Sequence, residues 1–173
     1  GVCFHLDKDV KEMFPYYKVT VPNKTDSRKN RGEYVEILKW TVTGAVGRAL
    51  TSDVPLAFCM SGGVDSNAVI SIAKKVFGYD VHGFTIIGDD KRYNERALVK
   101  QSVEELGIMH TFVELSRKNF LRNMRKIVRY HEAPLSTISY YVHWLMMKEI
   151  GKDYKVALSG SGGDELFAGY YDH

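Results

Sequence analysis

The sequence predicts an α/β fold, in which a parallel twisted sheet carries helices on both faces and is preceded by a short N-terminal β tail. Two observations lead to this prediction. From residue 33 onward, short apolar segments alternate with longer segments whose apolar residues recur at helical spacing. Two of the short segments run into glycine-rich turns, as expected of strands that are buried on both faces. This alternation favours parallel pairing with right-handed crossovers.

The main elements are expected in a regular order. The first is a helix over 33–51, where Tyr34, Ile37 and Leu38 begin an apolar stripe. Strands are expected at the short apolar segments, which are residues 55–60, 81–87, 110–115 and 155–158. Further helices are expected between them, over residues 67–76, 95–106, 118–131 and 139–150. In such a sheet, ligands bind beyond the carboxyl ends of the strands.

Residues 1–30 differ in character from the rest of the chain. Residues 2–6 and 16–21 are expected to be extended, around a polar turn at 7–11. The run 22–30 (PNKTDSRKN) is rich in turn formers and is expected to be a linker. Two extended pieces this short cannot form a core, so residues 1–30 are interpreted as the tail of another domain plus a linker. The main domain is expected over 31–173.

Composition limits the class of protein. The chain has 173 residues, of which 45% are hydrophobic and 26% charged, as in an ordinary globular domain. No apolar run approaches 18 residues and none follows a basic start, so neither a membrane span nor a signal peptide is expected. A net charge of +3 is too small to indicate nucleic-acid binding. Two cysteines, Cys3 and Cys59, cannot build a disulfide framework, which favours a reducing, cytoplasmic setting.

The first glycine-rich turn is the string SGGVDS at residues 61–66. Gly62 and Gly63 let the backbone approach an anion closely, and the following helix adds its positive end. Ser61 and Ser66 supply hydroxyl donors for phosphate oxygens. Because a carboxylate in an anion cradle would repel phosphate, Asp65 indicates a Mg²⁺ ion between them. The turn lacks the lysine of a Walker loop, and a plain capped strand-to-helix turn stays open as the alternative.

The second glycine-rich turn lies in the string LSGSGGDELFAGY at residues 158–170. It repeats the pattern of the first turn, with glycines after a strand and carboxylates where a helix begins. Asp164 beside Asp65 would complete a Mg²⁺ site. The alternative is an acidic helix start that is favoured only by the helix dipole.

These two strings carry a family resemblance. SGGVDS resembles the pyrophosphate-binding loop of the N-type ATP pyrophosphatases, and the second string is similar to the asparagine synthetase motif SGEGxDELFxGY. Residues 31–173 therefore resemble the synthetase domain of the glutamine-hydrolysing asparagine synthetases, which has an adenine nucleotide alpha hydrolase-like fold. Shorter resemblances to the same family lie at residues 52–55 (SDVP), 93–95 (YNE, with Asn94 in place of the usual Asp), 106–110 (LGIMH) and 132–134 (EAP).

The resemblance implies ATP-dependent amidation of a small-molecule carboxylate through an acyl-adenylate, by default aspartate to asparagine. It implies ATP and Mg²⁺ as cofactors, with Asp65 and Asp164 as the catalytic, metal-holding carboxylates. It also implies a set of nucleotide-binding residues, which are Met60, Ser61, Gly62, Gly63, Asp65, Ser66, Ile86, Ser159 and Gly160. Ammonia would come from glutamine by way of a glutaminase domain, of which residues 1–30 would be the tail. Neither nucleic acid nor membrane is an expected partner, and a homodimer is left open.

The chain departs from the family pattern at three places. Ser161 stands where the motif SGEG has Glu, which puts aspartate as the substrate in doubt. The chain starts at Gly1 without the cysteine nucleophile of a glutaminase, and it stops at His173 directly after the second motif, so a fragment is expected. Two alternatives stay open: an amidotransferase for a sugar uronic acid or another carboxylate, and a nucleotide-binding module without turnover. A tRNA-thiolating enzyme is disfavoured by the weak net charge and by the DELFAGY string.

Overall fold

The structure is a computed structural model that describes residues 2–6, 11–15, 18, 30–88 and 95–170. Most of the expected turn at 7–11, most of the expected linker at 22–30, and residues 93–94 of the YNE string lie outside the described residues. The chain divides into two compact units, Gly1–Lys39 and Trp40–His173, and each is described by itself. Among the described helices, none has the length and apolar character needed to span a membrane.

The first unit begins with a hairpin, in which β1 (Val2–Leu6) pairs antiparallel with β2 (Lys11–Pro15). The expected β tail is present, and its second strand is Lys11–Pro15. The segment 16–21, which was also expected to be extended, lies outside the described residues except for residue 18. Leu6 lies opposite Lys11, so Lys11 belongs to the strand and not to the turn. The reason is that antiparallel strands can be joined by a short connection, so the second strand starts earlier than the polar residues suggested.

Helix α1 (Arg31–Ala49) starts with a capping box. The Glu33 backbone N–H donates to Asn30 Oδ1 at 3.0 Å, and the Asn30 backbone N–H donates to Glu33 Oε2 at 2.9 Å. Two of the N–H groups that a helix start leaves without partners are satisfied in this way. The helix expected over 33–51 therefore begins at Arg31.

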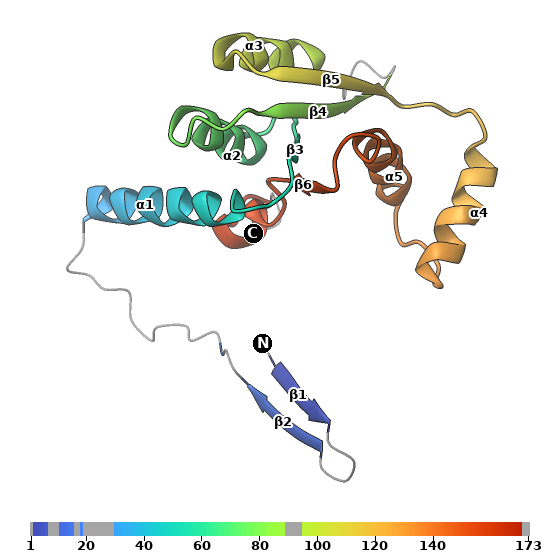
Figure 1. Cartoon of the computed structure of the whole chain (residues 1–173), viewed down its shortest axis with the longest axis horizontal. Helices are drawn as coiled ribbons and strands as arrows, with labels where there is room; N and C mark the ends of the chain where they lie inside the picture. The colour runs from blue at the N-terminus through green and yellow to red at the C-terminus, as the bar shows by residue number, and fades with distance from the viewer. Residues whose placement is uncertain (1, 7–10, 16–17, 19–29, 89–94, 171–173) are drawn as a thin grey trace. The chain divides into compact units, whose positions relative to one another are not determined.

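The second unit is built on a parallel sheet with the strand order β5-β4-β3-β6, which confirms the predicted fold class. Its strands are β3 (Leu56–Cys59), β4 (His82–Ile87), β5 (Met109–Glu114) and β6 (Val156–Leu158). Its remaining helices are α2 (Val64–Lys75), α3 (Arg96–Leu106), α4 (Phe120–His131), α5 (Ser139–Ile150) and α6 (Gly163–Phe167). Figure 1 shows this order of strands and helices.

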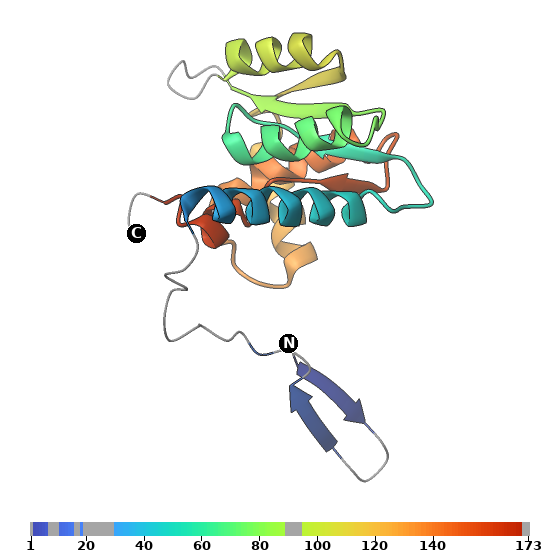
Figure 2. The ribbon, with the colours of Figure 1, turned by 90° about the vertical axis from the view of Figure 1, so that its left-hand side faces the viewer.

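Helices cover both faces of the sheet, as predicted. On one face, Phe58 of β3 packs in a core with Ile70 of α2 and Val99 of α3. On the other face, Phe84 of β4 packs with Met146 of α5. Figure 2 views the sheet with α2 and α3 in front of the strands. Apolar residues on both faces explain why the central strand β3 is a continuous apolar run and does not alternate.

The order in which successive strands are added to the sheet reverses at β3. From β3 the chain passes through α2 to β4 and then through α3 to β5. It returns through α4 and α5 to β6, on the other side of β3. Ala57 pairs with Ala157, and Phe58 pairs with Leu158, so β3 and β6 end at the same edge. This edge is the topological switch point, where open α/β sheets bind their ligands. Both glycine-rich turns follow directly from it.

Candidate functional site

The loop 61–66 between β3 and α2 is held by its own side chains. Ser66 is only 7% exposed. Its hydroxyl accepts a hydrogen bond from the Ser61 N–H at 3.1 Å and lies 2.9 Å from the Ser61 hydroxyl. The Gly63 N–H donates to Ser61 Oγ at 3.1 Å. Asn67 Nδ2 donates to the carbonyls of Ser61 (2.9 Å) and Gly63 (2.8 Å). The loop is thus preformed at the start of α2, whose first N–H groups have no partners within the helix.

The loop after β6 packs directly on the loop after β3. A Cβ atom built on Gly160 would lie 2.6 Å from the backbone nitrogen of Ser66 and 2.8 Å from the carbonyl carbon of Asp65. A Cβ atom on Gly163 would lie 2.5 Å from Cγ of Asp65. Real Cβ atoms do not approach other atoms this closely. Glycine is therefore required at position 160, where the neighbours are backbone atoms, whereas a side chain at position 163 would displace the carboxylate of Asp65. The second turn therefore supports the first, a role that the sequence did not indicate.

A cavity of about 720 Å³ opens where these two loops meet the side chains of α5. Its lining includes all but one of the residues that the sequence predicted as binding or catalytic, which are Met60, Ser61, Gly63, Asp65, Ser66, Ile86, Ser159, Gly160 and Asp164. The lining also includes residues that the sequence did not predict, which are Cys59, Val64, Thr85, Glu95, His143, Met146, Met147, Ala157 and Ser161. The structure thus brings together residues from segments far apart in the chain.

Gly62 is the predicted site residue that does not line the cavity. Its backbone N–H donates to Oε2 of Glu95 at 2.8 Å, and Glu95 itself lines the cavity. Glu95 is the residue just before α3. Its carboxylate accepts the hydrogen bond of an N–H group that the sequence predicted would bind an anion. The only sequence signal for Glu95 was its place in the YNE string.

Hydrogen bonds link the Met60 carbonyl to Thr85 and Thr85 to His110. The hydroxyl of Thr85, which is 2% exposed, donates to the Met60 carbonyl at 2.8 Å. The same oxygen lies 2.9 Å from Nε2 of His110. Because the hydroxyl has one hydrogen and gives it to Met60, the ring nitrogen must carry the hydrogen of the second bond. Burial, with a smaller contribution from His82, lowers the pKa of His110 to about 4, so the ring is neutral at neutral pH.

The cavity is lined in part by apolar side chains. Met60, Ile86 and Ala157 line it from the strands and their ends, and Met146 and Met147 line it from α5. Cys59 also lies here, and burial raises the pKa of its thiol, so the thiol is protonated at neutral pH and acts as a small apolar group. A lining that combines apolar side chains with a polar loop suits a ligand with one flat apolar part and one anionic part.

The chain matches the family model described as asparagine synthase over residues 38–173. It belongs to the asparagine synthase family. "Asparagine synthetase [glutamine-hydrolyzing] 1" of Bacillus subtilis is 30% identical over 90% of this chain and 24% of its own length. A putative asparagine synthetase of Methanocaldococcus jannaschii is 28% identical over 100% of this chain and 33% of its own length. The chain thus spans about a quarter to a third of these relatives.

Among solved structures, a glutamine-dependent NAD+ synthetase from Acinetobacter baumannii, in complex with ADP, is similar to this chain with a TM-score of 0.49. The similarity covers 87% of this chain and 29% of that one at 18% sequence identity.

Two carboxylates of this asparagine synthase family chain, Asp65 and Asp164, line the same cavity from opposite loops. Among the described residues, no group of three or more His, Cys, Asp or Glu side chains is arranged to hold a metal ion. Mg²⁺ is commonly held by one or two carboxylates, with waters and substrate phosphates as its other ligands. The two carboxylates therefore fit a Mg²⁺ ion that is shared with a phosphate.

Ser161 replaces the glutamate of the family motif at the cavity wall. Its hydroxyl accepts a hydrogen bond from the hydroxyl of Ser159 at 3.0 Å, and its N–H donates to Ser159 Oγ at 3.3 Å. This part of the wall therefore presents neutral hydroxyl groups.

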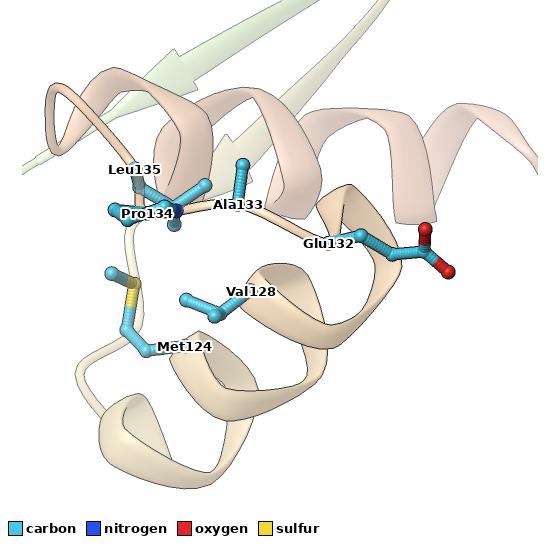
Figure 3. A pocket seen from close by; sticks show the side chains of 6 residues that line it. All are labelled: Met124, Val128, Glu132, Ala133, Pro134 and Leu135. Atoms are coloured by element: carbon cyan, nitrogen blue, oxygen red, sulfur yellow. The ribbon is translucent and has the colours of Figure 1, made fainter.

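A second hollow of about 640 Å³ lies between α4 and the segment that follows it. Its lining is mostly apolar and consists of Met124, Val128, Glu132, Ala133, Pro134 and Leu135. Figure 3 shows the carboxylate of Glu132 pointing away from Met124 and Val128. Residues 132–134 resemble the family segment that approaches the acyl substrate, but none of them lines the 720 Å³ cavity.

Proposed function

We propose that this chain is the nucleotide-binding core of an enzyme that uses ATP to amidate a carboxylate. One observation carries the proposal: two glycine-rich loops, each with a carboxylate, follow neighbouring parallel strands and line one cavity at the switch point. Membership of the asparagine synthase family supports the same reaction class. Aspartate, with asparagine as the product, is the default substrate.

The cavity supports a division of roles among its residues. Ser61, Gly63 and Ser66 would bind pyrophosphate at the start of α2, and Gly62 would support that loop through its backbone. Met60 and Ile86, which line the cavity, would contact the adenosine. Asp65 and Asp164 would hold Mg²⁺, which when bound offsets phosphate charge. Ser159 and Gly160 would contact the ribose and the α-phosphate.

The proposed reaction has two steps. A carboxylate oxygen attacks the α-phosphorus of ATP, the bond between the α and β phosphates breaks, and pyrophosphate leaves with the electron pair. Ammonia then attacks the acyl carbon of the adenylate, the bond to AMP breaks, and the nitrogen loses one proton to give the amide. The protein contributes mainly by positioning the reactants and by offsetting charge, because neither step needs a covalent bond to a side chain.

Glutamine is the proposed source of ammonia. The relatives from B. subtilis and M. jannaschii are named as glutamine-hydrolysing, which supports this source. Residues 1–30 would then be the end of a glutaminase-like domain and a linker, with the synthetase domain over residues 31–173. The hairpin of β1 and β2 is compatible with a segment that belongs to a larger β structure.

A second candidate is amidation of a carboxylate other than aspartate, such as a sugar uronic acid. The observation that favours it is Ser161, whose hydroxyl lines the cavity where the family motif has a carboxylate. Without that negative charge, the cavity wall at Ser161 has no electrostatic attraction for a positively charged group of the acyl substrate, such as the amino group of aspartate.

The test is release of pyrophosphate and AMP from Mg-ATP by the whole protein, with ammonium and a panel of carboxylates that includes aspartate. Release with aspartate supports asparagine synthesis, and release only with another acid supports the second candidate. ATP binding without AMP formation, with every acid, would contradict both and support a module that binds nucleotide without turnover.

A further inference from the structure

The first turn of α3 holds Gly62 from two sides. The carboxylate of Glu95 accepts the Gly62 N–H at 2.8 Å. A Cβ atom built on Gly62 would lie 3.2 Å from Cδ1 of Leu98 and 3.4 Å from Cδ of Glu95. Residues three apart in a helix share one face, so Glu95 and Leu98 approach the same peptide together. The contact joins the start of α3 to the loop that starts α2.

The orientation of this peptide affects the whole loop. Backbone N–H groups bind an anion only when several of them point at one place. The Gly62 N–H is directed to Glu95, and the next N–H, of Gly63, is directed to Ser61 Oγ at 3.1 Å. A hydrogen bond from an N–H to an ionised carboxylate is stronger than one between neutral groups. Glu95 therefore fixes the direction of the Gly62 N–H, and Ser61 fixes that of the Gly63 N–H.

We propose that Glu95 is a positioning residue for the pyrophosphate loop. It acts through the Gly62 peptide, and what the role requires is a side-chain oxygen that accepts from the Gly62 N–H. The proposal rests on the proposed function only for the identity of the anion, because the contact between Glu95 and Gly62 exists without it. The Leu98 side chain limits the space beside Gly62 and keeps the peptide from turning away.

The first experiment uses the ligand-free protein. Amide-resolved hydrogen exchange by NMR is measured for Gly62 in the wild type and in Glu95→Ala, Glu95→Gln and Glu104→Ala. We expect exchange about tenfold faster in Glu95→Ala, because a charge-assisted hydrogen bond is lost. Glu95→Gln keeps an oxygen acceptor and should remain within about threefold of the wild type. Glu104, an exposed residue on the same helix, is the matched control and should have no effect.

The second experiment measures binding of inorganic pyrophosphate with Mg²⁺ to the same variants by calorimetry. Glu95→Ala should bind about tenfold more weakly, whereas Glu95→Gln should bind at least as tightly as the wild type. Wild-type exchange and binding in Glu95→Ala, or an equal loss in Glu95→Gln, would overturn the positioning role. If the wild type itself does not bind pyrophosphate, the proposed function fails, and the exchange data alone decide the role of Glu95.

Discussion

Gly160 lies against the peptide that joins Asp65 to Ser66. A Cβ atom on Gly160 would be 2.6 Å from the Ser66 nitrogen, which is closer than real side chains approach a backbone. The loop after β6 therefore fits onto the loop after β3 only without a side chain at this position. The two loops behave as one structure, and the cavity between them depends on this fit.

Gly160→Ala should disturb both stability and the cavity. The neighbours are backbone atoms, which cannot move aside as the end of a flexible side chain can, so a loss of about 1–3 kcal/mol in the free energy of unfolding is expected. Binding of Mg-ATP should weaken as well, because the loops must separate. Urea unfolding and calorimetric titration with Mg-ATP measure the two effects.

Gly44→Ala is the matched control for that substitution. A Cβ atom on Gly44 would lie 3.5 Å from Arg48 Nη1, which is an ordinary contact. Gly44 lies inside α1, where alanine is better than glycine by about 0.5–1 kcal/mol. The control should be as stable as the wild type or more stable, and equal losses in both variants would contradict the close fit of Gly160.

Asp65→Asn should stop ATP-dependent chemistry while the fold is kept. The amide has nearly the shape of the carboxylate but no charge to hold Mg²⁺, so pyrophosphate release should fall by at least about 100-fold. The free energy of unfolding should change by less than about 1 kcal/mol. Asp53→Asn, at an exposed position before β3, serves as the control. Near wild-type pyrophosphate release in Asp65→Asn would rule out the metal-holding role.

Thr85→Val should destabilise the protein because its hydroxyl links two polar groups. The Met60 carbonyl and Nε2 of His110 would both lose their bond to Thr85, at a cost of about 1–3 kcal/mol. Thr85→Ser keeps the hydroxyl and loses only a methyl group, worth about 0.8 kcal/mol. Denaturant unfolding should rank serine above valine, and the opposite order would show that the hydrogen bonds contribute little.

His110 should make the protein less stable as the pH falls. Burial and then the nearby His82 hold its pKa at about 4, below the ordinary value of 6.5, so folding favours the neutral ring. The stability from the neutral ring is fully present above pH 6.5 and is lost as the pH falls toward 4. We expect a loss of about 1–2 kcal/mol over this range, less than the full shift implies, because the ring is only partly buried.

Urea unfolding between pH 7 and pH 4, for the wild type and His110→Asn, measures this contribution. The variant should lack this part of the pH dependence, whereas His131→Asn, at an exposed position, should keep it. An unchanged pH profile in His110→Asn would assign the acid sensitivity to other groups.

Much of the fold could be predicted because its signals are local. The strands of the main sheet lie in short segments that are rich in apolar residues, and their expected bounds differ from the observed ones by at most one residue. Lys11 was expected in the polar turn, but it belongs to the second strand of the N-terminal hairpin, because it pairs with Leu6. Pairing is a contact between two segments, and the residue types of one segment do not reveal it.

The candidate site divides in the same way. Ser61, Asp65 and Asp164 belong to two short strings, and the strings alone predicted that both loops face a ligand. Glu95 and Thr85 gave no comparable signal, because each acts on a residue at least 25 positions away in the chain. Their roles come from hydrogen bonds that exist only after the strands are ordered.

By itself, the sequence determined the class of fold, the two loops and the family, because apolar spacing and glycine-rich turns are properties of consecutive residues. Only the tertiary structure decided that β3 and β6 are neighbours, that Gly160 closes on Ser66, and that Glu95 holds Gly62. The physical reason is that these contacts depend on the strand order and on atomic distances. Residue types along the chain do not specify either of them until packing brings distant segments together.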